Sequence, residues 1–104
     1  MKEQRRSRRI LASVPLELQS DGGPQAALTA VINLQGALIL SSLHWPSGSE
    51  LRIKNPETDL EVRGRVVWAG SPDRSGTYKI GVEFKSSSPE FWGARYDPHG
   101  EEAP

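Results

Sequence analysis

The sequence predicts an all-β protein folded as one small antiparallel barrel. Apolar residues recur at every second position in several short segments, which is the period of a half-buried strand. Clusters of Gly, Pro, Asn, Asp and Ser separate these segments at the short spacing typical of sandwiches and barrels. No helical period extends beyond a turn or two. A closed or nearly closed barrel is favoured because closure removes exposed strand edges.

The first two predicted strands lie in the N-terminal third of the chain. Residues 14–20 alternate apolar and polar side chains, and Pro15 places this strand at an edge because proline lacks an N–H. A turn-forming cluster at 20–24 precedes a second strand over 26–34. The apolar faces of these two strands consist of Val14, Leu16 and Leu18, and of Leu28, Ala30, Ile32 and Leu34.

The middle of the chain contains two shorter strands. Gly36 precedes the apolar run 37–40, and a turn or bulge is expected there because glycine accepts positive φ and admits a ligand close to the backbone. After a loop at 44–49, residues 51–54 alternate Leu and Ile with Arg and Lys. A hairpin turn is expected at 55–59.

Two longer strands complete the predicted barrel. They cover 60–68 and 78–84, joined by a loop at 70–77 that is rich in Ser, Pro, Asp and Gly. Their apolar positions are Leu60, Val62, Gly64, Val66 and Trp68 in the first, and Tyr78, Ile80, Val82 and Phe84 in the second. We therefore expect a closing hairpin.

The segment after the last strand is predicted to cap the barrel. It is rich in Ser and Pro and then acidic, but it carries Phe91, Trp92 and Tyr96. Three aromatic side chains are too apolar to remain in solvent without cost. We interpret the tryptophans of the chain, Trp45, Trp68 and Trp92, as core or barrel-end residues, because a small barrel needs large side chains to fill it.

The length of 104 residues and the absence of cysteine fit one domain with one hydrophobic core. No disulfide or thiolate metal cluster can support the fold, so stability must come from apolar burial and backbone pairing. We expect a domain over residues 1–98 that includes an N-terminal arm at 1–11, followed by a disordered acidic tail at 99–104.

The composition also predicts a cytoplasmic location. Lack of cysteine fits a reducing compartment. No apolar run approaches the roughly 20 residues needed to span a bilayer, and the Arg-rich start lacks the hydrophobic segment of a secretion signal. We therefore expect neither secretion nor insertion into a membrane.

Charge is distributed unevenly although its sum is zero. The chain has 13 Lys and Arg residues against 13 Asp and Glu residues. Residues 1–10 hold five of these cations and only Glu3 as an acid, which leaves the remainder mildly acidic. A long polyanion such as DNA or RNA usually needs a broad basic face. Clustered arginines on an acidic body suit a small anion better.

No catalytic arrangement stands out, and the chain is predicted not to be an enzyme. It has no cysteine, and its two histidines, His44 and His99, fall in a loop and in the tail. A nucleophile–base pair or a multi-histidine metal site would be difficult to build from them. The acidic residues are scattered, so neither a metal nor a cofactor is expected.

Two motifs carry the functional prediction. The run Arg5-Arg6-Ser7-Arg8-Arg9 precedes the first strand, and the run from Val31 to Leu38 contains Asn33 and Gly36. Together they resemble a PilZ domain. That family has an RxxxR motif, matched by Arg5 and Arg9, and a [D/N]xSxxG motif at a strand turn. The runs 64–68 and 81–84 look like the family's last two strands, so that the resemblance covers about residues 3–85.

The resemblance implies a six-stranded barrel that binds the bacterial second messenger cyclic di-GMP. The residues implied as ligand-binding are Arg5, Arg6, Arg9, Asn33 and Gly36. Guanidinium groups bind phosphate and the O6/N7 edge of guanine through paired, charge-assisted hydrogen bonds. An arm that orders on binding would change the shape of the molecule and signal to a downstream protein not yet identified.

The second motif departs from the family pattern. With Gly36 as the anchor, Val31 occupies the acidic or Asn position and Asn33 the Ser position. An alternative register places Asn33 first and Gln35 at the Ser position but displaces the glycine. We prefer the first register because a backbone turn is harder to move than a side chain. Val31 then offers no acceptor for a guanine N–H. A lost hydrogen bond to a charged partner costs about 1.5–3 kcal/mol, roughly 10- to 100-fold in affinity.

Other functions stay open from the sequence. A PilZ-like barrel that no longer binds nucleotide could serve as a protein-interaction adaptor. The observation behind this alternative is that Val31 lacks the acceptor of the family's second motif. A small barrel could also bind single-stranded nucleic acid through arginines and exposed aromatic residues, although the acidic body disfavours this. Asn33 would then be a simple turn former, and Gly36 a bulge glycine.

Overall fold

The computed structural model describes residues 8–86 and 89–96. The elements in chain order are β1 (Ile10–Leu11), β2 (Pro15–Ser20), β3 (Gly23–Asn33), β4 (Gly36–Ser41), β5 (Glu50–Asn55), β6 (Leu60–Ala69), β7 (Tyr78–Phe84), α1 (Pro89–Trp92) and the 3-10 turn η1 (Gly93–Arg95). Neither helical segment within this part of the chain is long and apolar enough to cross a membrane.

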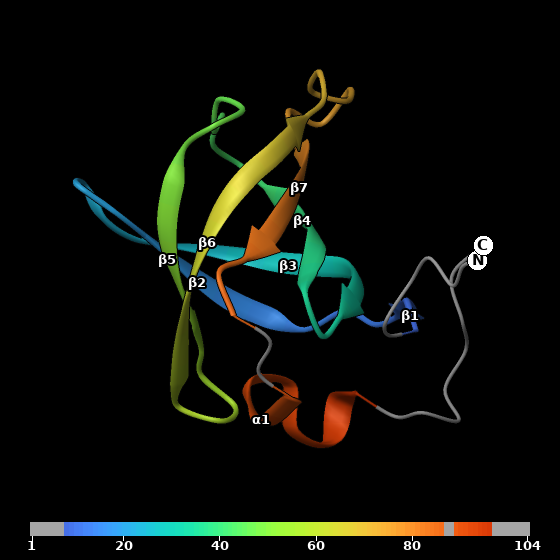
Figure 1. Ribbon diagram of the computed structural model, residues 1–104. Coiled ribbons are helices and arrows are strands. Elements are labelled where there is room, and N and C mark those ends of the chain that lie inside the picture. Colours follow the sequence, from blue (N-terminus) through green and yellow to red (C-terminus); the bar gives the residue numbers. More distant parts are fainter. Residues whose placement is uncertain (1–7, 87–88, 97–104) are drawn as a thin grey trace, which may run out of the picture.

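Six of the strands close into an antiparallel barrel, which confirms the predicted fold. The sheet runs in the order β3, β2, β5, β6, β7 and β4, and pairing between β4 and β3 closes it (Figure 1). The two-residue strand β1 is an addition, which pairs with the far end of β3. Contrary to expectation, β2 is no edge strand. Pro15 is tolerated because it begins β2, and pairing with β5 starts only at Glu17.

A buried threonine joins β1 to β2, which are two parts of one interrupted strand beside β3. Thr29 is 1% exposed. Its hydroxyl accepts a hydrogen bond from the Val14 N–H at 2.8 Å and donates one to the Ala12 carbonyl at 2.5 Å. The side chain thus replaces the backbone partner that the interruption removes, as buried polar groups require.

Replacing Thr29 with valine should therefore destabilise the barrel although the side-chain volume is kept. The substitution leaves the Val14 N–H and the Ala12 carbonyl without this partner, at a cost of about 1–3 kcal/mol for each unsatisfied group. Urea denaturation followed by tryptophan fluorescence measures the loss. The matched change Thr77→Val, in the β6–β7 loop, removes only a solvent-exposed contact with the Ser75 hydroxyl at 3.0 Å and should stay within about 0.5 kcal/mol of wild type. Equal stability of the two variants would contradict this role of the hydroxyl.

The core consists of the inward residues of the barrel strands together with aromatic residues of the C-terminal segment. The apolar strand residues exposed by 2% or less are Ile10, Leu16, Leu18, Ile32, Ile39, Ile53, Val66 and Ile80. The alternation predicted for residues 14–18, 51–54 and 78–84 agrees with this core. Apolar burial of this extent is the main stabilising contribution in a chain without disulfides.

Two β-bulges change the alternation predicted for the long strands. In β3 the register shifts between Thr29 and Val31, so that Thr29 is buried whereas Leu28 is 46% exposed. In β6 it shifts between Val66 and Trp68, and Trp68 is 51% exposed. The prediction that Trp68 is a core or barrel-end residue was therefore wrong. An extra residue in one strand moves every later side chain to the opposite face.

The C-terminal segment caps one end of the barrel, as predicted (Figure 1). Phe91 and Trp92 are fully buried, and Phe84 contacts both rings at centroid distances of 5.5 and 5.7 Å. The Phe91 carbonyl accepts hydrogen bonds from Asn55 Nδ2 at 2.7 Å and Thr58 Oγ1 at 3.0 Å. Polar bonds to the β5–β6 turn thus hold the aromatic cluster in position.

Candidate functional site

The turn between β3 and β4 has a specific local structure. Asn33 Oδ1 accepts a hydrogen bond from the Gln35 N–H at 2.6 Å, which is an Asx-type turn. The Gln35 carbonyl accepts a second bond from the Phe84 N–H at 2.7 Å. Asn33 and Gly36 lie opposite each other in the β3–β4 register. These bonds place the predicted second motif on the barrel surface beside β7.

Gly36 allows β4 to approach β7 closely. A Cβ atom built at this position would lie 2.1 Å from the Val82 carbonyl oxygen, well inside van der Waals contact. The absence of a side chain therefore has a packing reason.

An apolar row crosses the outer surface beside this turn. Strand registers align Leu11, Val31, Leu38, Gly81 and Trp68 across β1, β3, β4, β7 and β6. The two bulges bring the β3 and β6 residues into this row from either side. Bulges commonly redirect side chains next to functional sites.

Three residues of the row, Val31, Leu38 and Gly81, line a cavity of about 290 Å³. The cavity is lined by Arg9, Val31, Asn33, Gln35, Gly36, Ala37, Leu38, Val67, Gly81, Val82 and Glu83. Three of the predicted ligand-binding residues, Arg9, Asn33 and Gly36, are thus brought together with Val31. The other two, Arg5 and Arg6, lie outside the described residues. Glu83 also lines the cavity but was not predicted, because no local signal in the sequence distinguishes it from any other outward residue of a strand.

The end of the arginine run is held close to the barrel. Arg8 and Arg9 are partly buried, and the Tyr96 hydroxyl donates a hydrogen bond to the Arg8 carbonyl at 3.1 Å. Strand β1 begins at the next residue. Arg9 therefore reaches the cavity from a backbone segment that is fixed on both sides.

The C-terminal cap also contacts the turn directly. Trp92 Nε1 donates a hydrogen bond to the Asn33 carbonyl at 2.8 Å, while the indole ring is buried in the core. The position of Asn33 thus depends on the barrel core as well as on its own turn. This contact could not be expected from residues 31–38 alone.

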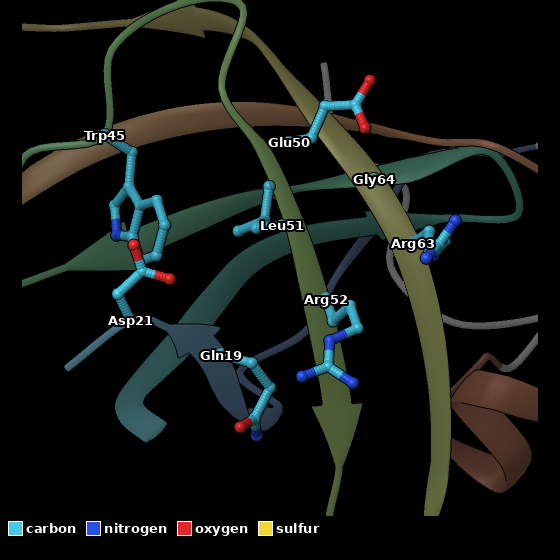
Figure 2. A pocket seen from close by; sticks show the side chains of 8 residues that line it. All are labelled: Gln19, Asp21, Trp45, Glu50, Leu51, Arg52, Arg63 and Gly64. Atoms are coloured by element: carbon cyan, nitrogen blue, oxygen red, sulfur yellow. The ribbon is translucent and has the colours of Figure 1, made fainter. Parts of the chain in front are cut away.

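A second cavity, of about 440 Å³, lies where the β2–β3 hairpin separates from the start of β5 (Figure 2). Two of its charged side chains, Glu50 and Arg52, are paired with neighbours of opposite charge. Lys85 donates a hydrogen bond to Glu50 at 2.9 Å, and this bond and charge hold the pKa of Glu50 below its usual value. Arg52 pairs with Glu61 at 3.5 Å. None of the residues predicted for the site lines this cavity, so the smaller one is the better candidate.

Metal chemistry finds no support in the part of the chain that the structure describes. Within 8–86 and 89–96 there is no group of three or more acidic or histidine side chains that could hold an ion. His44 instead packs against the ring of Tyr78 at a centroid distance of 5.5 Å.

Comparison with known proteins assigns the family. The family model of the PilZ domain matches residues 3–91. The chain belongs to the PilZ domain family. The match includes the arginine run, the β3–β4 turn and all six barrel strands of this PilZ domain. No curated protein matches the chain.

Two solved structures share the fold of this PilZ domain. The inhibitor of motility MotI/DgrA from Bacillus subtilis is 20% identical with a TM-score of 0.67, over 85% of this chain and 46% of that one. The structure "PilZ domain with c-di-GMP of YcgR from Escherichia coli" is 14% identical with a TM-score of 0.59, over 84% of this chain and 82% of that one. The chain thus spans less than half of the Bacillus protein.

Proposed function

We propose that this PilZ domain binds cyclic di-GMP in the cavity beside the β3–β4 turn. The observation that carries the proposal is the convergence of Arg9, Asn33 and Gly36 on one cavity, from segments separated in the sequence. Membership of a receptor-domain family, and a solved relative described with c-di-GMP, support it. We propose that binding takes place in the cytoplasm, as expected from the sequence. The domain with bound nucleotide then acts on a partner protein.

The walls of the cavity suit a nucleotide with separate anionic and aromatic parts. Arg9 supplies a guanidinium group for a phosphate oxygen or a guanine edge. Val31, Leu38 and Gly81 form an apolar floor for the face of a base. Trp68 lies at the end of the same row, half exposed, and its indole packs over Gly70 and Gly81. It can stack on a base that extends beyond the cavity.

The signalling step is proposed to be the ordering of the N-terminal arm around the ligand. Arg9 continues directly into β1, which pairs with β3 through two residues, Ile10 and Leu11. One of their partners is Val31, a residue of the cavity floor. Contacts of Arg5 and Arg6 with the nucleotide would therefore change the conformation of the arm, next to the β1–β3 pair that holds its C-terminal end in place.

Titration calorimetry of the wild-type protein and of Arg9→Ala tests the proposal. Wild type should bind cyclic di-GMP, and loss of the guanidinium should weaken binding about 10- to 100-fold. Arg74→Ala, in the exposed β6–β7 loop, is the matched control and should keep wild-type affinity. No binding heat for wild type at about 100 μM ligand, where a micromolar site would saturate, would refute the function.

A nucleotide-independent adaptor is the second candidate. The specific observation is that Val31, at the position of the family's acceptor, is 8% exposed within an apolar row that continues to the exposed Leu11 and Trp68. Such a row also fits a protein partner. A partner from the source cell whose capture is unaffected by Arg9→Ala and by added nucleotide would favour this function.

A further inference from the structure

Glu83 occupies a distinctive place in the cavity. It lies directly opposite Gly36 in the β4–β7 register and lines the cavity together with residues of the β3–β4 turn. Its side chain is 59% exposed. Within residues 8–86 and 89–96 its ion-pair partner is Arg65, with NH2 at 3.7 Å, and exposed pairs of this length are weak. The carboxylate can therefore exchange this partner for a ligand at little cost.

The remaining walls offer few strong acceptors. Arg9 carries donors only. Asn33 already uses its amide oxygen for the Gln35 N–H. The side chain of Gln35 also lines the cavity but offers a neutral amide oxygen, a weaker acceptor than a carboxylate. The side chains of Val31, Leu38 and Val82 are apolar and offer none. Among the described residues that line the cavity, Glu83 is the one carboxylate.

A carboxylate at this place matches one edge of guanine. The Watson–Crick edge of guanine presents two adjacent donors, N1–H and the N2 amino group. An ionised carboxylate has two acceptor oxygens and can receive both bonds at once. Adenine presents an N1 lone pair on that edge, and this lone pair would face the negative charge. The geometry therefore favours guanine over adenine.

We propose that Glu83 recognises the Watson–Crick edge of a guanine base and replaces the acceptor that Val31 lacks. This inference rests on the proposed binding of cyclic di-GMP. The acceptor has moved from β3 to β7, across the β4 strand, so that the base lies over Leu38 and Gly81 with its edge toward Glu83.

Calorimetry of Glu83→Gln with cyclic di-GMP and cyclic di-AMP is the test. A glutamine keeps the shape but replaces one acceptor oxygen by an amino donor, so cyclic di-GMP should bind about 10- to 100-fold more weakly. Discrimination against cyclic di-AMP should decrease in parallel. Glu61→Gln, on the outer face of β6 and paired with Arg52, is the matched control and should behave as wild type.

Arg65→Gln separates base recognition from a structural role of the ion pair. If Glu83 contacts the base, this variant keeps or improves the affinity for cyclic di-GMP, because Arg65 no longer competes with the base for the carboxylate. If Arg65→Gln weakens binding as much as Glu83→Gln, the pair acts structurally and the inference is overturned. Wild-type affinity in Glu83→Gln also overturns it while leaving the proposed function intact, whereas absence of binding to wild type refutes both.

Discussion

Gly36→Ala is expected to destabilise the barrel by more than about 3 kcal/mol, at the severe end for a single added methyl group. The new Cβ would lie 2.1 Å from the Val82 carbonyl oxygen. That atom belongs to the backbone of β7, so no side chain can rotate to relieve the clash. Either β4 or β7 must move, and the hydrogen bonds of the β4–β7 pair are disturbed.

Urea denaturation of Gly36→Ala and Gly81→Ala measures this effect. A Cβ at Gly81 would meet its nearest neighbour, Trp68 Cβ, at 3.6 Å, which is ordinary contact. Gly81→Ala should therefore change stability by less than about 1 kcal/mol, although both glycines line the same cavity. A small domain has only about 5–15 kcal/mol of stability in total. A Gly36→Ala variant as stable as Gly81→Ala would show that the close approach of β4 to β7 is dispensable.

Trp92→Ala is expected to cost about 3–5 kcal/mol, the usual range for removing a large buried aromatic side chain. The ring is fully buried, stacks on Phe84 at 5.7 Å and meets Phe91 edge-on at 4.9 Å. Its loss opens the end of the barrel that α1 covers. Trp68→Ala, which removes the same side chain from a half-exposed position, should cost less than about 1 kcal/mol.

Trp92→Phe distinguishes the packing of the ring from its hydrogen bond to the site. Phenylalanine keeps most of the apolar burial but cannot donate to the Asn33 carbonyl, so a loss of about 1–3 kcal/mol is expected. Because that carbonyl belongs to the turn that lines the cavity, affinity for cyclic di-GMP should fall as well. Thermal denaturation and calorimetry on the same samples provide both values. Unchanged affinity in a folded Trp92→Phe protein would show that the cap does not position the turn.

The sequence predicted the strands whose signal is local. In β2, β5 and β7 the apolar residues alternate without interruption, and Leu16, Ile53 and Ile80 are buried accordingly. The same rule failed in β3 and β6. A bulge is a relation between two paired strands, and nothing in β6 alone shows that Val67 has no counterpart on β7.

The candidate site, like the strands, could be predicted from the sequence only in part. Arg9, Asn33 and Gly36 were predicted from short motifs within one resemblance, and the structure brings them to one cavity. Glu83 was not predicted, because its proximity to Gly36 arises from strand pairing between distant segments. The contact between Trp92 and Asn33 is likewise a consequence of the cap folding over the end of the barrel.

The sequence by itself determined the fold class, the capping role of the aromatic C-terminal segment and the family, because periodicity, turn residues and short motifs are written along the chain. The tertiary structure alone decided where the two bulges fall, which acidic residue lines the cavity beside the motif turn, and that Trp68 is exposed. These depend on the register between strands, and register is set by packing around the whole barrel and not by any one segment.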